Sequence, residues 1–330
     1  MRIMGKKYLM AIVPGEVCGG CDMAIVDLHE KLLDVLGDIE IVYWPIAMDF
    51  KEEDIDTLEE IDIAIFQGGI RTEKQKELVE KVARKSRVKI AFGACACFGG
   101  IPDLADLYGS ENILKTAYLE SPSTTNDVGV IPGRCSEKSL VCAPKLLEEN
   151  YKVDDIIDVD IYMPGCPPPT DLIGEAIEIL LGHFKEGKPI QKGLVIAPIK
   201  TLCDECDREK PETIEISKFR RIHEGEVDPK KCFLAQGIIC LGPITRGGCG
   251  LKCIKANMPC RGCMGPAPEV IDPGAKMVSA LAALVEIANE PKLSDEELAE
   301  RVKQIQDPVG LFYRFTFGLN ILQKVRRRAK

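Results

Sequence analysis

Residues 8–21 have the sequence YLMAIVPGEVCGGC, an apolar run that ends at Pro14-Gly15 and is followed at once by two cysteines. A short apolar run bounded by turn residues is typical of a buried strand. Similar runs recur along the first half of the chain, and we predict strands at residues 8–13, 39–43, 61–66, 88–92 and 159–162. Amphipathic segments separate these runs. Strands that alternate with helices predict an α/β fold with a flavodoxin-like parallel sheet.

Helical spacing of apolar residues predicts helices at residues 22–36, 72–85, 137–150 and 171–184, which complete a flavodoxin-like domain at 1–195. Residues 196–275 differ, because eight cysteines lie among Gly and Pro with few apolar runs. We expect this poorly regular cysteine-rich domain to need bound metal in order to fold. Residues 276–330 form a predicted helical C-terminal tail, with helices at about 275–289, 295–306 and 310–327.

Composition and charge exclude several classes of function. The chain has 330 residues and a formal net charge of -9, and its basic residues cluster only near the C-terminus, which argues against a nucleic-acid partner. The N-terminal apolar run is too short for a signal peptide or a membrane span, so we expect a cytoplasmic protein without a membrane span. No phosphate-binding loop or dinucleotide fingerprint is present. Fifteen cysteines in a reducing compartment indicate metal binding rather than disulfides.

Three cysteine motifs follow predicted strands. Cys18 and Cys21 come after the first strand, Cys95 follows the fourth in Gly-Ala-Cys, and Cys166 follows the fifth in Pro-Gly-Cys-Pro-Pro. Ligands of open parallel sheets bind at the carboxyl ends of the strands, so these cysteines can converge there. Neighbouring glycines allow backbone amides to approach the sulfurs. The alternatives are a thioredoxin-like redox pair at Cys18 and Cys21 and a buried, inert thiol at Cys95.

The downstream cysteines divide into two sets of four: Cys203, Cys206, Cys232 and Cys240, then Cys249, Cys253, Cys260 and Cys263. Sets of four thiolates suit either zinc or iron–sulfur clusters, so spacing alone does not identify the metal. Two structural zinc sites in a non-enzymatic adaptor remain an alternative.

The C-x-x-C, Gly-Ala-Cys and Pro-Gly-Cys-Pro-Pro motifs, in this order, resemble the proximal-cluster motifs of nickel-iron hydrogenase small subunits and of the related complex I subunit. The cysteine-rich domain at 196–275 resembles only the hydrogenase subunits. The resemblance implies three 4Fe-4S clusters: a proximal one on Cys18, Cys21, Cys95 and Cys166, a distal one on Cys203, Cys206, Cys232 and Cys240, and a medial one on Cys249, Cys253, Cys260 and Cys263. Many family members have histidine where Cys203 stands and a non-ligand near Cys253. Cysteine at both positions implies three complete cubanes.

The remaining cysteines and the histidines receive structural interpretations. Cys97 is expected to be a packed neighbour of the proximal motif, and Cys135 and Cys142 are expected to be buried thiols. His29 and His183 fall in predicted amphipathic helices, where a surface or packing role is expected.

The resemblance also implies the function. The chain lacks the paired C-x-x-C motifs of a nickel-iron site, so a partner large subunit would split dihydrogen while this chain conducts electrons to an acceptor subunit, possibly one linked to heterodisulfide reductase. Three segments, Tyr43-Trp44-Pro45, Ile70-Arg71-Thr72 and Gly99-Gly100-Ile101-Pro102, are most similar to methanogen methyl-viologen-reducing, deazaflavin-independent hydrogenases. The alternatives are the small subunit of a deazaflavin-reducing or sulfur-reducing hydrogenase and the zinc-binding adaptor.

Overall fold

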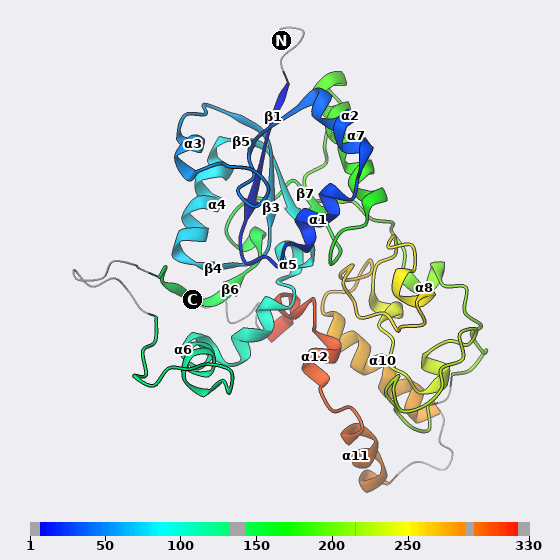
Figure 1. Ribbon diagram of the computed structural model, residues 1–330. Coiled ribbons are helices and arrows are strands. Elements are labelled where there is room, and N and C mark those ends of the chain that lie inside the picture. The colour runs from blue at the N-terminus through cyan, green and yellow to red at the C-terminus, as the bar shows by residue number, and fades with distance from the viewer. Residues whose placement is uncertain (1–6, 133–142, 215, 288–293, 323–330) are drawn as a thin grey trace. The chain divides into compact units, whose positions relative to one another are not determined.

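A six-stranded parallel sheet forms the centre of the N-terminal unit in the computed structural model (Figure 1). Its spatial order is β2-β1-β3-β5-β7-β8, and its first five strands follow the flavodoxin-like order. The strands are β1 (Tyr8–Pro14), β2 (Ile39–Tyr43), β3 (Ile61–Gln67), β5 (Ser86–Phe92), β7 (Ile161–Met163) and β8 (Leu194–Val195). The predicted α/β class and parallel sheet are therefore confirmed.

The structure describes residues 7–132, 143–214, 216–287 and 294–322. The chain divides into two units, Met1–Ile196 and Ala197–Lys330. Within the described residues, no helix has both the length and the apolar character needed to cross a membrane.

Helices cover both faces of the sheet, with α1 (Gly20–Val26), α2 (Glu30–Asp38) and α7 (Thr170–Glu186) on one face and α3 (Glu52–Asp56) and α4 (Glu73–Lys85) on the other (Figure 1). Strand β3 is buried along its whole length, as expected for a strand with helices on both faces. Helix α4 confirms the predicted helix at 72–85. Thr72 caps this helix, because its side chain accepts the backbone N–H of Gln75.

Two predicted helices of this unit differ from the structure. The segment 22–36 forms two helices rather than one, and His29, with a left-handed φ of 52°, lies at the break between them. The segment 137–150 is wrong as a helix where it can be checked, because Leu146–Tyr151 forms strand β6, antiparallel to β4 (Ile70–Thr72). The Asp106 carboxylate accepts the backbone N–H of Asn150, so tertiary contacts override the local helical pattern here.

The N-terminal unit has two further short helices. Helix α5 (Ala94–Phe98) follows β5, and α6 (Gly109–Lys115) precedes the segment that returns to β6. The sequence did not predict either helix, because both are too short to show a clear helical period.

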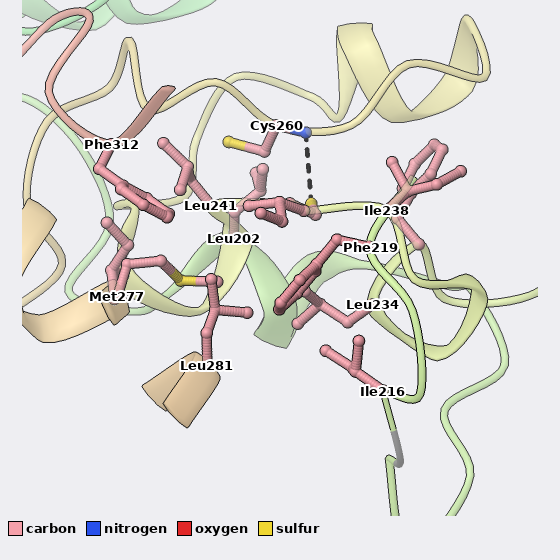
Figure 2. Close-up of a cluster of buried hydrophobic side chains, with 14 of the residues drawn as sticks. Leu202, Ile216, Phe219, Leu234, Ile238, Leu241, Cys260, Met277, Leu281 and Phe312 are labelled. Carbon is pink, nitrogen blue, oxygen red and sulfur yellow. Dashed lines mark hydrogen bonds between the residues drawn. The ribbon is translucent and has the colours of Figure 1, made fainter. Parts of the chain in front are cut away.

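The described residues of the C-terminal unit have little regular structure before residue 273. They form the short helices α8 (Leu202–Glu205) and α9 (Lys252–Lys255) and two 3₁₀ turns, at Leu234–Gln236 and Gly242–Ile244. Three helices follow: α10 (Pro273–Ile287), α11 (Asp295–Lys303) and α12 (Pro308–Phe312). Figure 2 shows that the buried core joins residues of the loops to Met277, Leu281 and Phe312 of these helices. The tail helices therefore supply apolar surface that the cysteine-rich loops lack.

The predicted helix at 310–327 is not one continuous helix over the described residues 310–322, and residues 323–327 lie outside the described part of the chain. Helix α12 ends at Phe312, and a separate 3₁₀ turn covers Phe317–Leu319. Phe312 and Phe317 are both buried, at 3% and 9% exposure.

Candidate metal centres

Backbone hydrogen bonds bring the three strand-end motifs of the N-terminal unit together. The N–H of Gly93 donates to the Met163 carbonyl (2.8 Å), and that of Ala94 donates to the Gly165 carbonyl (2.7 Å). These bonds join the Cys95 motif directly to the Cys166 motif. The Cys18 motif is held in the same way on the loop after β3, since the N–H of Gly15 donates to the Gln67 carbonyl (2.7 Å).

The electrostatics of these cysteines indicate four neighbouring thiols. Burial raises the pKa of Cys21 well above its usual value, and the charges of Cys95, Cys166 and Cys18 raise it further. Burial likewise raises the pKa of Cys95 to about 12, with further contributions from Cys166 and Cys18. Thiolates in this position repel one another unless a cation lies between them, because bound metal inverts the local preference for the protonated form. The donor set therefore fits an iron–sulfur cluster.

Glycines leave room around these sulfurs. Gly93 has a φ of 92°, and a Cβ there would lie 2.6 Å from Cys21 Sγ. Gly100 has a φ of 62°, and a Cβ there would lie 2.5 Å from Cys95 Sγ. No larger residue fits at either position. The backbone N–H of Ile101 donates to the Cys95 sulfur. Such N–H donors to cluster sulfurs tune reduction potential.

A buried carboxylate lies beside this group and was not identified from the sequence. Asp22 follows Cys21 and is 6% exposed. Its Oδ1 accepts the indole N–H of Trp44 (2.7 Å), and the Gln67 amide, assigned with its nitrogen toward Asp22, donates to both carboxylate oxygens (3.0 and 3.2 Å). The Asp22 charge is among the causes that raise the pKa of Cys21. The acidic residue directly after the C-x-x-C motif was the available signal.

The other cysteines and histidines agree with structural roles where the structure describes them. Cys97 is 2% exposed, and its thiol donates to the Ala91 carbonyl (3.2 Å). His183 Nδ1 lies 2.7 Å from the Lys188 carbonyl, and His29 lies at the helix break. Cys135 and Cys142 lie outside the described residues.

In the C-terminal unit, one pocket is lined by Cys203, Cys206, Cys232 and Cys240. Burial raises the pKa of Cys203 to about 12, and the neighbouring Cys240 charge raises it further. A Cβ at Gly242 would lie 3.0 Å from Cys203 Sγ, so this glycine also leaves room for sulfur.

Arg208 lines the same pocket and contributes a positive charge. Its guanidinium lies 3.9 Å from the Phe233 ring centroid, and its Nη2 donates to Asn257 Oδ1 (2.6 Å). Its Nε is buried and has no hydrogen-bond partner among the described residues. A cluster sulfur is a suitable acceptor for that N–H, so the pocket fits an iron–sulfur cluster chemically.

The remaining cysteines lie as two neighbouring pairs, Cys249 with Cys253 and Cys260 with Cys263. The N–H groups of Leu251 and Lys252 donate to the Cys249 sulfur. The Cys260 N–H donates to Cys240 Sγ (3.3 Å), a bond that links the second and third cysteine sets (Figure 2). Across the described parts of the chain, no three His, Cys, Asp or Glu side chains have the arrangement that binds a single metal ion.

A flavodoxin-like sheet with four thiols at its carboxyl edge, and a second unit rich in cysteines, defines a class of iron–sulfur electron-transfer proteins. Residues 18–180 match the family described as the NADH ubiquinone oxidoreductase 20 Kd subunit. The iron-sulfur subunit of the F420-non-reducing hydrogenase of Archaeoglobus profundus is 36% identical over 97% of this chain and 99% of its own length. A subunit of the vhu F420-non-reducing hydrogenase of Methanocaldococcus jannaschii is 41% identical over 91% of each chain.

The chain therefore belongs to the F420-non-reducing hydrogenase small-subunit family, as its motifs predicted. It is a nickel-iron hydrogenase small subunit, with an electron-transfer role in an oxidoreductase whose family carries iron–sulfur clusters. A chain of the [NiFeSe]-hydrogenase of Desulfomicrobium baculatum, at 17% identity and a TM-score of 0.50, shares the fold over 80% of this chain and 96% of its own.

Proposed function

We propose that this subunit carries electrons from dihydrogen oxidation on a nickel-iron large subunit, through three 4Fe-4S clusters, to an acceptor subunit of the heterodisulfide-reductase type in the cytoplasm. The observation that carries the proposal is the grouping of twelve cysteines: four neighbouring thiols in the N-terminal unit, four that line one pocket of the C-terminal unit, and two neighbouring pairs. The proximal set is Cys18, Cys21, Cys95 and Cys166, the medial set is Cys249, Cys253, Cys260 and Cys263, and the distal set is Cys203, Cys206, Cys232 and Cys240.

The clusters would supply one-electron redox chemistry, and the chain would position them and adjust their potentials. At the proximal set, the buried Asp22 contributes negative charge and the Ile101 N–H contributes a hydrogen bond to sulfur. At the distal set, Arg208 and Lys210 line the cysteine pocket and contribute positive charge. A charge gradient of this sign favours the electron on the distal side, because negative charge destabilises a reduced cluster and positive charge stabilises it.

The metal content of the chain tests this proposal. Anaerobically purified protein should contain about twelve irons with matching acid-labile sulfide, three cubanes of four. The protein should be brown and its zinc content low. Zinc as the main metal, or iron near four per chain, would contradict the three-cluster assignment and favour the adaptor alternative.

The acceptor is tested on the native complex. Purification without oxygen should recover this chain with a large subunit and an iron–sulfur acceptor subunit, and the complex should reduce viologen dyes with dihydrogen but not a deazaflavin. Recovery of a deazaflavin-binding or sulfur-reducing subunit instead would replace the proposed acceptor while leaving the role in hydrogenase intact.

A further inference from the structure

An arginine-rich cavity of 330 Å³ lies in the C-terminal unit, apart from the pocket of the distal cysteines. Four arginines from three segments line it: Arg220, Arg221, Arg261 and Arg314. Its volume falls within the range of small-molecule sites, which begins at about 300 Å³. Apolar side chains, including Phe219, Ile238 and Leu311, form much of the wall.

The positive charge in this cavity is poorly balanced by the protein. Arg261, Arg314 and Arg221 lie close enough for their positive charges to repel one another. Asp307 is the acidic residue of the lining, and its Oδ1 already accepts the N–H of Gly310 (2.9 Å). None of the four guanidinium groups forms an ion pair with a carboxylate of the described residues. Converging charges of one sign are unfavourable unless an opposite charge joins them.

Arg220 places a fixed positive charge at the cavity wall. Its Nε donates to the Gln236 carbonyl (3.0 Å), and its Nη2 donates to the Glu226 carbonyl (3.0 Å). These bonds hold the guanidinium in place, while Nη1 is buried and has no hydrogen-bond partner among the described residues. The guanidinium charge of Arg220 therefore stays fixed at the cavity wall, without a carboxylate partner among the described residues.

We propose that this cavity binds a small oxyanion of the phosphate class. Guanidinium groups bind phosphoryl oxygens through paired, charge-assisted hydrogen bonds, and several of them favour a ligand with more than one negative charge. The apolar wall and the volume leave space for more than a single phosphate group, so the fitting ligands are pyrophosphate or an organic phosphate.

Balancing the charge of a neighbouring cluster does not explain all four arginines. Arg261 can serve that purpose, since it directly follows Cys260. Arg220 is instead held by two backbone carbonyls, and the Nε of Arg314 donates to the Gly310 carbonyl (3.2 Å). The oxyanion therefore accounts for charges that the cysteines leave unpaired.

Calorimetric titration of the anaerobic native complex with pyrophosphate at low ionic strength tests the site. We expect one saturable site per chain, and binding about tenfold weaker in Arg221→Gln and in Arg314→Gln, since each removes one charge-assisted contact. Arg84→Gln, at an exposed position near the end of α4, is the matched control and should bind as the parent does. All three variants should keep their iron and their dihydrogen-dependent viologen reduction, so failure here would leave the proposed function standing.

Two outcomes would overturn the site. One is the absence of saturable binding, or equal affinity in the parent and in all three variants. The other is binding that occurs only after the acceptor subunit has been removed, which would mean that acidic side chains of a partner occupy the cavity instead.

Discussion

Asp22 is a buried charge directly after a cysteine of the proximal set, and its carboxylate is held by Trp44 and Gln67. A fixed negative charge makes it harder to add an electron to a neighbouring cluster. Asp22→Asn should therefore raise the potential of the proximal cluster, by about 40 mV for a Coulomb interaction of about 1 kcal/mol. A redox titration followed by electron paramagnetic resonance measures the shift.

Trp44→Phe is the control for this substitution, because it removes the indole hydrogen bond and keeps the charge. Its potential should move less than that of Asp22→Asn. An unchanged or lower potential in Asp22→Asn would mean that Asp22 acts on the fold of the motif and not on the cluster.

Cys253 is exposed and lies near Cys249. Many relatives have a non-ligand residue near this position, according to the sequence resemblance. The native protein should show no stoichiometric three-iron signal. Cys253→Ala should create one, since the loss of one thiolate leaves one corner of the cubane open. Electron paramagnetic resonance of the oxidised protein checks both statements.

The control for this prediction is Cys97→Ala, which removes a buried thiol that donates to a backbone carbonyl and belongs to no proposed set. Its spectra should match those of the parent. A three-iron signal already present in the native protein would show that the medial ligand set is wrong.

At the level of helices and strands, burial determines what the sequence could predict. Strand β3 is fully buried, and its largely apolar sequence predicted it almost to the residue. Strand β6 was mistaken for a helix because its residues LLEENY carry no alternation, and only its pairing with β4 makes it a strand. The glycine-flanked cysteines predicted candidate sites, whereas the contacts of Asp22 and Arg208 depend on residues distant in the sequence.

The core of the C-terminal unit depends on helix α10. Met277 is fully buried among Leu281, Phe312 and residues of the cysteine-rich loops (Figure 2). Met277→Ala should lower the stability of this unit by about 2–5 kcal/mol, the usual cost of such a cavity. Hydrogen exchange of the α10 amides measures the stability of this unit. Tryptophan fluorescence would not, because the single tryptophan, Trp44, lies in the other unit.

Val278→Ala is the matched control, since Val278 is the next residue in the helix and is 49% exposed. It should change α10 exchange by less than about 1 kcal/mol. Equal effects of the two substitutions would mean that α10 does not stabilise the cysteine-rich loops through Met277.

At the scale of the whole molecule, each of the two units carries its own cysteine sets, and the proposed electron path enters at the sheet and leaves from the cysteine-rich unit. The proposed entry point rests on the carboxyl edge of the parallel sheet, where the ligands of such folds bind, and on the family resemblance, which implies that the large subunit is received there. The charges proposed to tune the clusters favour the same direction of electron transfer. The negative Asp22 lies beside the entry set, and the positive Arg208 and Lys210 lie beside the exit set.

The order of the clusters can be tested with two variants of the assembled complex. Cys18→Ala should prevent dihydrogen from reducing any cluster of this chain, because it damages the entry cluster. Cys203→Ala should leave reduction of the proximal and medial clusters at the parent rate and abolish only transfer to the acceptor. Cys203→His is its control, because it keeps a ligand at the same position and tests whether loss of a ligand or loss of folding causes the effect. Rapid mixing with dihydrogen, followed by freezing and spectroscopy of each cluster, separates these steps. If the Cys18 variant reduced its distal cluster at the parent rate while the Cys203 variant could not reduce its proximal one, electrons would enter through the cysteine-rich unit instead.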